Sequence, residues 1–405
     1  MFGKAALLLI LGYSTIFMVY NLNMVSKANN TVDTYVAYYD KTVASEMASS
    51  AANLACNALF SVPSWQSTYN EASFNGGTIS VIIDTFPDGK RQVFAVSNYY
   101  GTKDTVKITM QPSSFAKFAY YGSSMTGRAA YNTGDTIWGP MHVQGTMNIS
   151  GSPIFFGKVT TERGISRGGA AGTPQFLGGY ESGVDLPLPT SITSDLSSQA
   201  ASGGHVVPAG KDLYLTFNAD GTVTYREGST GSFTTVALST YAPNGVIYVA
   251  RGDAYIKGTM SGQATLAVDR SSGLGNGNIF FDGSLTYAND PNTPGSTDML
   301  GLIASNNFII RDVPANQPNL NIQATCMSLG GGLTAENMSA LTHTGSVNIT
   351  GGLIESQPQE TGVYASNGQI QKGYNVSIHY DERLLLDTPP AFAETGTFEI
   401  ISWLE

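Results

Sequence analysis

Helical spacing of apolar and polar positions runs without interruption through the N-terminal part of the chain. From Phe2 to Val25 the only charged side chain is Lys4, and the first proline is Pro63. After Val25 the sequence becomes polar but keeps apolar residues at steps of three and four, which form one stripe on a helix. The pattern predicts a single helix over residues 1–60, about 90 Å long at a rise of 1.5 Å per residue.

The stripe in the second half of this helix is interleaved with small residues. Its members are Val32, Val36, Tyr39, Val43, Met47, Ala51, Leu54 and Ala58. Ala and Ser dominate the stretch between Ala44 and Ala58, and small side chains let a helix backbone approach its neighbour closely. The stripe therefore packs on the chain's own globular part, on neighbouring helices, or on both.

Three interpretations of the apolar segment remain open. A cleaved secretory signal fits the start MFGK and the apolar run after it, but no A-x-A site follows promptly. A plain membrane anchor fits the length, because about 20 apolar residues span a bilayer, yet it leaves the rest of the helix unexplained. The third is a helix that resides in the inner membrane and later packs in a filament core.

A strand-like pattern follows the helix. Residues 75–121 alternate apolar and polar positions, and the sequence FPDGK, with Pro87, Asp88 and Gly89, has hairpin-turn composition. The expected strands include Ile79–Ile83, Val93–Ala95 and Thr105–Met110. Residues 61–130 are therefore predicted to form a small antiparallel sheet packed on the lower part of the helix.

Short strands recur between turn residues from residue 131 onward. Glycines six residues apart introduce the pattern at Gly139, Gly145, Gly151 and Gly157. The expected inward-facing residues are Ile279, Phe281, Leu285, Leu302, Ala304, Val347, Ile349 and Leu353. Many short strands with even turn spacing predict a β-solenoid, similar to a parallel β-helix, over 131–405, with a β-sandwich as the alternative. The range 162–240, rich in Gly, Ser, Thr and Pro, is expected to be a loop-rich insertion. The predicted fold class is α+β.

Composition narrows the possible environments and partners. Only 12% of the residues are charged and 46 are glycine, against about a quarter charged in ordinary domains, which favours extracellular β structure. The net charge of -10 argues against a nucleic-acid partner. Two cysteines, Cys56 and Cys326, do not make a disulfide framework, and whether they pair is left open.

Residues that could carry chemistry are scattered. None of the histidines has the sequence spacing of a metal-ligand pair. They are His142, His205, His343 and His379. Stacked β folds include enzymes that act on polysaccharides, and the candidates here are Asp253, Asp269, Arg270 and Asp282. These lie beside glycines in turns, where Asp bonds its own backbone, so neither catalysis nor a cofactor is expected. The tripeptide Arg251-Gly252-Asp253 matches an integrin-binding sequence only weakly.

One stretch of the helix carries a family resemblance. The segment KTVASEMASSAANLACNALF, and within it Ala48–Ala55, resembles the Ala- and Ser-rich run that ends the N-terminal helix of large accessory pilins of type IV pili. Downstream, DTIWGPMHVQGTMNISGSPIFFGKVTT, GNIFFDGSLTY, DMLGLIASNNFIIR and HYDERLLLDTPPAFAETGTFEIISWLE are similar to successive motifs of a bacterial family that joins such a helix to a β-rich domain. Major pilins carry a glutamate at the fifth helix position, where this chain has Ala5, and no acid precedes Asp33.

The resemblance implies a structural subunit of an extracellular type IV pilus-like filament on the bacterial cell surface. Its implied partners are copies of itself in a helical homo-oligomer, the pilus assembly machinery, and the inner membrane before assembly. The alternative is a minor or tip pilin, or a membrane-anchored adhesin that binds a glycan or a surface. The residues expected to pack between helices are Phe2, Leu7, Leu8, Leu11, Ile16, Phe17, Val32, Val36, Val43, Met47 and Leu54.

Overall fold

The chain divides into two compact units. The computed structural model describes residues 2–86, 89–123, 131–133, 135–168, 172–191, 194–270, 276–364 and 370–405, and the predicted turn residues Pro87 and Asp88 lie outside these. One unit comprises Met1–Ser113 and Gly396–Glu405, and the other comprises Ser114–Thr395. These limits differ from the expected boundary at residue 130, because the antiparallel sheet ends earlier and recruits the C-terminal strand.

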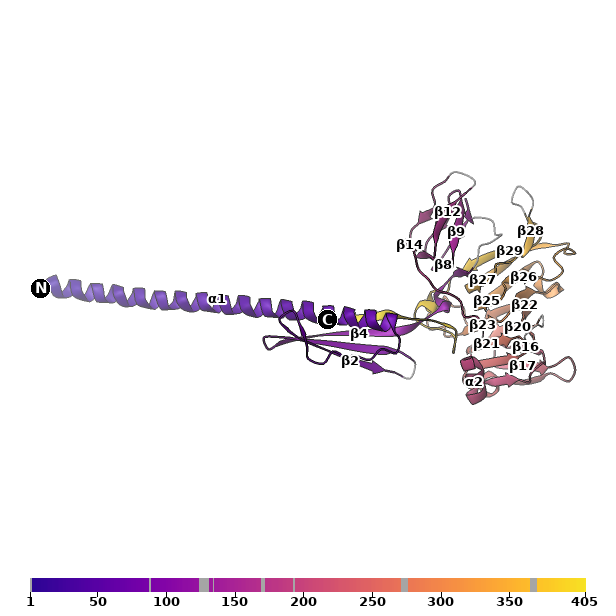
Figure 1. The fold of residues 1–405 in the computed structure, drawn as a ribbon, viewed down its shortest axis with the longest axis horizontal. Helices are drawn as coiled ribbons and strands as arrows, with labels where there is room; N and C mark the ends of the chain where they lie inside the picture. Colours follow the sequence, from indigo (N-terminus) through magenta and orange to yellow (C-terminus); the bar gives the residue numbers. More distant parts are fainter. Residues whose placement is uncertain are drawn as a thin grey trace. The chain divides into compact units, whose positions relative to one another are not determined.

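The N-terminal segment is one α-helix, α1 (Phe2–Ser61), of 60 residues (Figure 1). It continues through Thr15, whose hydroxyl donates to the carbonyl of Gly12 at 2.9 Å. The helix stops just before Val62, which precedes Pro63, because a following proline disfavours the helical backbone. The prediction of a single long helix is confirmed.

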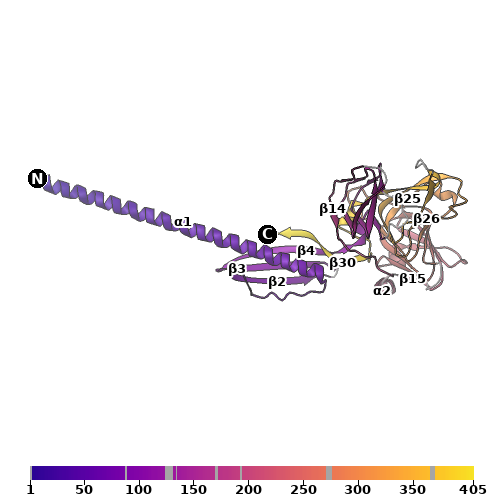
Figure 2. The ribbon, with the colours of Figure 1, turned by 45° about the horizontal axis from the view of Figure 1, so that its top comes forward.

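The sheet of the first unit has the strand order β1-β2-β3-β4-β30, and Figure 2 shows β30 beside β4. The bounds are β1 (Ala72–Phe74), β2 (Gly77–Thr85), β3 (Arg91–Tyr99), β4 (Thr102–Ser114) and β30 (Glu394–Leu404). Strands β1 to β4 pair antiparallel, with Val81 opposite Ala95 and Ala95 opposite Val106. The predicted antiparallel sheet is therefore present, but β30, from the far end of the chain, was not expected in it.

Small residues hold the lower half of α1 close to this sheet. Four fully buried alanines line the contact: Ala48, Ala51, Ala52 and Ala55. The hydroxyl of Ser97 on β3 donates to the carbonyl of Ala44 at 2.6 Å. At Gly77 a Cβ atom would lie 2.4 Å from the carbonyl oxygen of Asn98 and 2.9 Å from Cε of Met47. The Ala-rich stretch thus serves close packing within the subunit.

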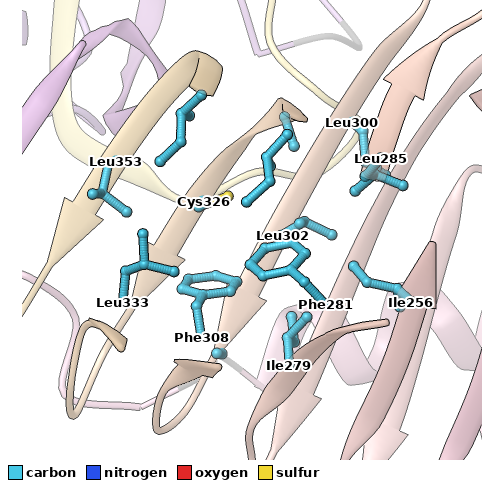
Figure 3. Close-up of a cluster of buried hydrophobic side chains, with 14 of the residues drawn as sticks. Ile256, Ile279, Phe281, Leu285, Leu300, Leu302, Phe308, Cys326, Leu333 and Leu353 are labelled. Carbon is cyan, nitrogen blue, oxygen red and sulfur yellow. The ribbon is translucent and has the colours of Figure 1, made fainter. Parts of the chain in front are cut away.

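Parallel strands form the first sheet of the second unit. In spatial order they are β15 (His205–Val207), β19 (Val246–Ala250), β21 (Gln263–Asp269), β23 (Met299–Ala304), β25 (Asn319–Ser328), β27 (Thr344–Glu355), β5 (Tyr120–Gly122), β8 (Met141–Val143), β11 (Val159–Thr161) and β14 (Tyr180–Ser182). Leu302, Cys326 and Leu353 stand in register across β23, β25 and β27, and their side chains lie together in the core (Figure 3). Because Leu353 is also opposite Tyr120, strands from the two ends of this unit meet.

A second parallel sheet lies across the core from the first. It consists of β16 (Leu213–Phe217), β20 (Ala254–Met260), β22 (Ile279–Tyr287), β24 (Phe308–Ile310) and β26 (Leu333–Ala335). The rings of Phe281 and Phe308 stack with centroids 5.9 Å apart (Figure 3). The predicted inward residues are all buried, with exposures from 0% to 3%, so that part of the prediction is confirmed.

A further parallel ladder joins the second half of β22 to the first halves of β25 and β27. Leu285 of β22 stands opposite Ile322 of β25, which stands opposite Ile349 of β27. Strand β29 (Ile370–His379) continues this ladder in parallel and pairs antiparallel with β28 (Gly362–Tyr364). After each strand of the first sheet the chain thus passes through the other ladders. When it returns to the first sheet, its new strand lies beside the previous strand of that sheet.

The glycine repeat marks turns between stacked short strands. These strands form two small parallel ladders: β6 (Tyr131–Asn132) with β9 (Thr146–Ser150) and β12 (Gly164–Arg167), and β7 (Thr136–Ile137) with β10 (Ile154–Phe155) and β13 (Gln175–Phe176). At Gly157 a Cβ atom would lie 2.0 Å from the carbonyl carbon of Gly139. Glycine is therefore required where these two turns stack.

Residues 162–240 are not a loop-rich insertion. They contain β12 to β16, α2 (Ser194–Gly203), β17 (Thr222–Glu227), β18 (Thr234–Ala237) and α3 (Leu238–Tyr241). Strands β16, β17 and β18 pair antiparallel, and Val223, Leu238 and Tyr241 are buried against the core. The polar composition concealed these strands, because most of their outward positions are Thr, Tyr or charged residues.

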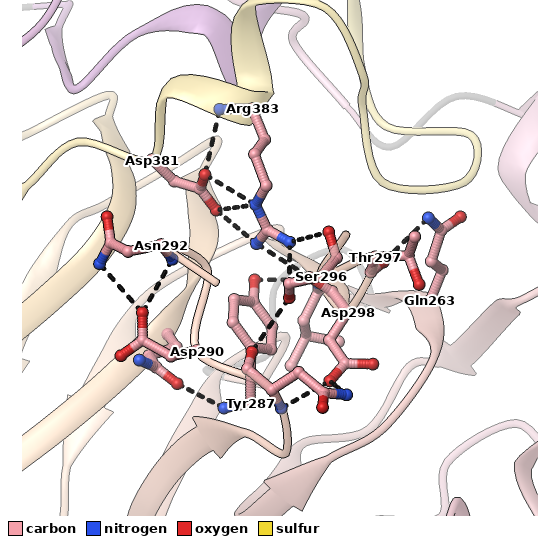
Figure 4. A network of polar contacts seen from close by, with 12 residues as sticks. Gln263, Tyr287, Asp290, Asn292, Ser296, Thr297, Asp298, Asp381 and Arg383 are labelled. Atoms are coloured by element: carbon pink, nitrogen blue, oxygen red, sulfur yellow. Dashed lines mark hydrogen bonds and ion pairs between the residues drawn. The ribbon is translucent and has the colours of Figure 1, made fainter. Parts of the chain in front are cut away.

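Short segments cover the outer face of the first sheet. They include η1 (Phe115–Lys117), α2 and η3 (Glu382–Leu385), with apolar side chains packed on Ile303, Met327 and Ile354. Arg383 fastens η3 to a neighbouring loop (Figure 4). Its guanidinium donates to Asp381 at 2.7 Å, to the carbonyl of Ser296 at 2.9 Å and to that of Asp298 at 3.0 Å.

Candidate assembly surface on the N-terminal helix

The first half of α1 exposes large apolar side chains around its whole circumference. The consecutive residues Leu7 to Leu11 are all exposed, Leu8 by 73%. Soluble monomers rarely expose a contiguous apolar surface of this kind. By length and composition α1 is able to cross a membrane.

The residues predicted to pack between helices separate into two groups. Those with exposed side chains are Leu7, Leu8, Leu11, Ile16, Phe17, Val32, Val36 and Leu54. Val43 is half-buried, and Met47 is only 1% exposed because it belongs to the core between α1 and the sheet. Met47 is thus occupied within its own subunit. The side chain of Phe2 lies outside the described part of the chain.

Exposed apolar and aromatic residues continue beyond the length that a membrane covers. Val32, Tyr35, Val36 and Tyr38 are all exposed, whereas a hydrocarbon core about 30 Å thick covers only about 20 residues of helix. The ring of Tyr39 contacts that of Tyr99 on β3 edge to face, with centroids 6.5 Å apart. Sequence spacing detected this stripe but could not tell which residues face the sheet.

Charge is nearly absent from the exposed apolar segment. Lys4 is the only charged side chain from Phe2 to Val25, and the first acid of the chain is Asp33. A carboxylate buried among apolar helices is costly unless it is paired. Contacts made by this segment therefore avoid the cost of burying a carboxylate. They also lack the register between helices that a paired carboxylate would fix.

The carboxylates considered for catalysis all have structural partners. Asp253 Oδ1 accepts the backbone N–H of Asn278 at 2.8 Å, and burial raises the pKa of its carboxyl group. Asp269 accepts from the hydroxyls of Tyr248 and Ser305 at 2.8 and 2.9 Å. These acids do not converge on one groove. Asp253 bonds the backbone of the adjacent strand, whereas its own backbone was the expected partner.

The remaining members of that set are also engaged. Asp282 pairs with Arg311 at 2.5 Å and lies 3.8 Å from Lys257. Arg270 follows Asp269, whose carboxylate accepts the backbone N–H of Arg270 at 2.8 Å. Each contact joins outer positions of adjacent strands or closes a turn, so the arrangement supports the stack.

The tripeptide Arg251-Gly252-Asp253 forms the short connection between β19 and β20, where Gly252 is buried and Asp253 is half-buried. The Asp253 side chain is held by Asn278, and a Cβ atom at Gly252 would lie 2.2 Å from the carbonyl oxygen of Lys211. The close approach of two backbones therefore explains the glycine, and the carboxylate faces a strand end.

Histidines and cysteines serve local structure. His142 contacts Thr160 at 2.7 Å, His205 contacts Glu227 at 2.7 Å, and His343 contacts Tyr374 at 2.9 Å. Within the described ranges no group of three His, Cys, Asp or Glu side chains is placed to hold a metal ion. Both cysteines are buried and unbonded to each other, and burial raises the pKa of the Cys326 thiol.

Comparisons with known proteins add little to these observations. No protein-family model matches the sequence, and no curated protein matches it. Among solved structures the chain is similar to the competence-associated pilin ComZ from Thermus thermophilus, at 14% identity and a TM-score of 0.35, over 83% of this chain and 85% of that one. That TM-score is too low to establish a shared fold.

Proposed function

We propose that this protein is a structural subunit of an extracellular type IV pilus-like filament and that it resides in the inner membrane before assembly. The observation that carries the proposal is the exposed apolar surface of α1, which continues from Leu7 to Tyr39 in one helix. A bilayer accounts for about 20 of these residues. Copies of the same helix in a filament core would cover all of them.

Packing of the lower helix supports an outward position for the β units. The face that includes Met47, Ala51 and Ala55 is occupied by the subunit's own sheet, whereas Leu54 and Phe60 remain exposed. Those exposed positions are available to neighbouring helices. Burial of apolar area contributes roughly 25 cal/mol per Å², of which ordering and association costs leave only part.

We infer that the parallel ladders form a β-solenoid. Parallel register between strands of successive turns, as from Leu266 to Leu302 to Cys326, supports this interpretation. A β-sandwich would instead pair its strands antiparallel. In the proposal, residues 1–60 act in the membrane and filament core, the sheet of the first unit supports the helix, and the second unit (Ser114–Thr395) forms the exposed surface.

A second candidate is a minor or tip pilin, or a membrane-anchored adhesin. The exposed aromatic pair Trp138 and Phe156 favours this candidate. Their rings stack with centroids 3.8 Å apart, and the two residues are 51% and 38% exposed. Flat exposed aromatic rings suit contact with a partner's apolar surface, such as a sugar face. A glycan array probed with the full chain and with Trp138→Ala tests this candidate, which a lack of any Trp138-dependent signal would contradict.

Filaments sheared from producing cells test the main proposal. The chain should form the filament body, with α1 at the axis and the β units outside. Recovery of the chain only in membranes, or only at the ends of filaments made from another protein, would contradict the role of a principal subunit.

A further inference from the structure

A row of stacked planar side chains runs along the outer face of the second sheet. Tyr214, Tyr255 and Phe280 stand in register on β16, β20 and β22, at half-buried positions that alternate with core positions. Successive rings stack with centroids 4.7 Å apart. Arg226 on β17 stands opposite Tyr214 and extends the row. Its guanidinium carbon lies 4.4 Å from the ring centroid of Tyr214 and 4.7 Å from that of Phe233, so the cation is held between two rings.

This guanidinium has no counter-charge. In the part of the chain that the structure describes, no hydrogen bond or ion pair involves Arg226, and its Nε atom is buried without a partner. The adjacent Glu227 contacts His205 at 2.7 Å instead. Because the rings cover both faces of the guanidinium, only the donors at its edge, the two Nη groups, are left for a ligand. An anion that accepts from both of them would form the charge-assisted pair that arginine commonly makes.

Hydroxyl groups and an exposed ring lie beside the cation. Thr216, Thr224 and Thr235 stand in register across β16, β17 and β18, and the hydroxyls of Thr224 and Thr235 are 2.8 Å apart. Residues two apart on a strand share a face, so this row lies about 6.6 Å from the row of Arg226 on the same outer face. Phe233, which covers the cation, is itself 52% exposed.

These features together limit the class of ligand. The unpaired cation requires an anion, the exposed ring suits an apolar ring face, and the threonine row suits a ligand rich in hydroxyl groups. A sugar that carries a carboxylate or a sulfate has all three properties. An acidic peptide would satisfy the cation but requires neither the flat ring nor the hydroxyl row, and the net charge of -10 disfavours a nucleic acid.

We propose that the outer face of β16, β17 and β18 binds an acidic sugar unit of a polysaccharide. The anionic group accepts hydrogen bonds from the two Nη groups of Arg226, the sugar ring lies against Phe233, and its hydroxyls bond the threonine hydroxyls. A uronate and a sulfated sugar supply the same anionic chemistry. This inference does not depend on filament formation, and it involves neither Trp138 nor Phe156.

The test is calorimetric titration of the full chain in detergent micelles. The probes are tetragalacturonate, its neutral methyl ester, a carrageenan tetrasaccharide that carries sulfate and no carboxylate, and a tetraglutamate peptide. An acidic tetrasaccharide should bind, and the neutral ester should bind at least about tenfold more weakly, because it cannot form the charge-assisted contact. Tighter binding of tetragalacturonate assigns the anionic group as a carboxylate, and tighter binding of the carrageenan fragment assigns it as a sulfate.

Variants locate the binding site. Arg226→Gln should weaken binding by about tenfold or more, and Phe233→Ser should also weaken it. Arg226→Lys keeps the positive charge in the stack but loses the planar fork, so it should fold and still bind more weakly. Arg163→Gln, at another exposed arginine of the second unit, and Trp138→Ala should leave binding unchanged. The thermal unfolding midpoint of each variant checks that it is folded.

Several results would overturn the proposal. They are a lack of binding by both acidic tetrasaccharides, binding of the neutral ester as tight as that of the acidic ones, and tighter binding of tetraglutamate. Unchanged binding in both Arg226 variants, or loss of binding in Trp138→Ala, would do the same.

Discussion

The carboxylate of Asp253 accepts the backbone N–H of Asn278 at 2.8 Å and so joins the starts of two neighbouring strands. The same contact recurs along the stack. Asp212 accepts the N–H of Asp253 at 3.0 Å, Asn278 accepts that of Asn307 at 3.2 Å, and Asn307 accepts that of Gly332 at 3.2 Å. Each polar side chain thereby satisfies a backbone donor of the next turn, which would otherwise be costly to bury.

Removal of one member of this ladder should destabilise the second unit. Asn278→Ala leaves the N–H of Asn307 without its acceptor and removes the amide that donates to Asp253 at 3.0 Å. We expect a loss of about 1–3 kcal/mol in the free energy of unfolding, measured by urea denaturation. The control is Asn348→Ala, which loses an exposed bond to Asn321 at 3.0 Å and should cost less than about 0.5 kcal/mol. Equal losses would contradict the role of the ladder.

Met47 and Leu54 should separate folding from assembly. Met47 is 1% exposed in the subunit core, whereas Leu54 is 40% exposed. Met47→Ala should lower the free energy of unfolding of the first unit by about 2–5 kcal/mol. Leu54→Ala should leave unfolding in detergent nearly unchanged but reduce the yield of sheared filaments. The opposite assignment of the two effects would contradict the proposed division of the helix surface.

Acid should destabilise the second unit through His142. Its ring is buried, contacts Thr160 and Gln144 at 2.7 and 3.0 Å, and stacks on Tyr121. Burial lowers the pKa of His142 and Lys117 lowers it further, while the Gln144 hydrogen bond and the charges of Asp185 and Glu162 raise it by less.

The sign of this effect follows from proton uptake. The folded pKa lies below the unfolded value of about 6.5, so the unfolded state binds more protons as pH falls. The stability is present above about pH 6.5 and is lost as pH falls through the folded pKa. In His142→Gln, urea denaturation between pH 7 and 5 should show a smaller pH dependence, whereas the exposed-site control His379→Gln should retain it. An unchanged dependence in His142→Gln would rule out this assignment.

A charge in the apolar helix should prevent assembly. Leu8 is 73% exposed in the isolated subunit, so Leu8→Asp should leave thermal unfolding of the β units unchanged. In a filament core the aspartate would be buried without a partner, at a cost of several kcal/mol. We expect sheared filaments to be absent, whereas the matched variant Leu8→Met should assemble. Normal filaments from Leu8→Asp would contradict core packing by this segment.

Local patterns made much of the fold predictable. Helix α1 follows from apolar spacing and the absence of proline before Pro63, and the inward residues Ile279 and Phe281 follow from alternation. The pairing of β30 with β4 and of β5 with β27 was not predictable. These pairs join strands from opposite ends of the chain, and a short strand carries no local mark of its distant partner.

The sequence predicted which residues belong to the candidate assembly surface, but not which of them face the subunit's own sheet. Steps of three and four placed Met47 and Leu54 in one stripe, yet the close approach at Gly77 puts the sheet on one side of that stripe. Met47 therefore enters the subunit core while Leu54 stays outside. Which side a helix presents to its own sheet depends on tertiary contacts such as the one from Ser97 to Ala44.

Electron microscopy with helical reconstruction of filaments sheared from producing cells tests the central claim most directly. The account predicts a filament composed of this subunit, with residues 2–39 of α1 bundled at the axis and the β units outside. A core built from another protein, or filaments in which this helix does not reach the axis, would contradict it.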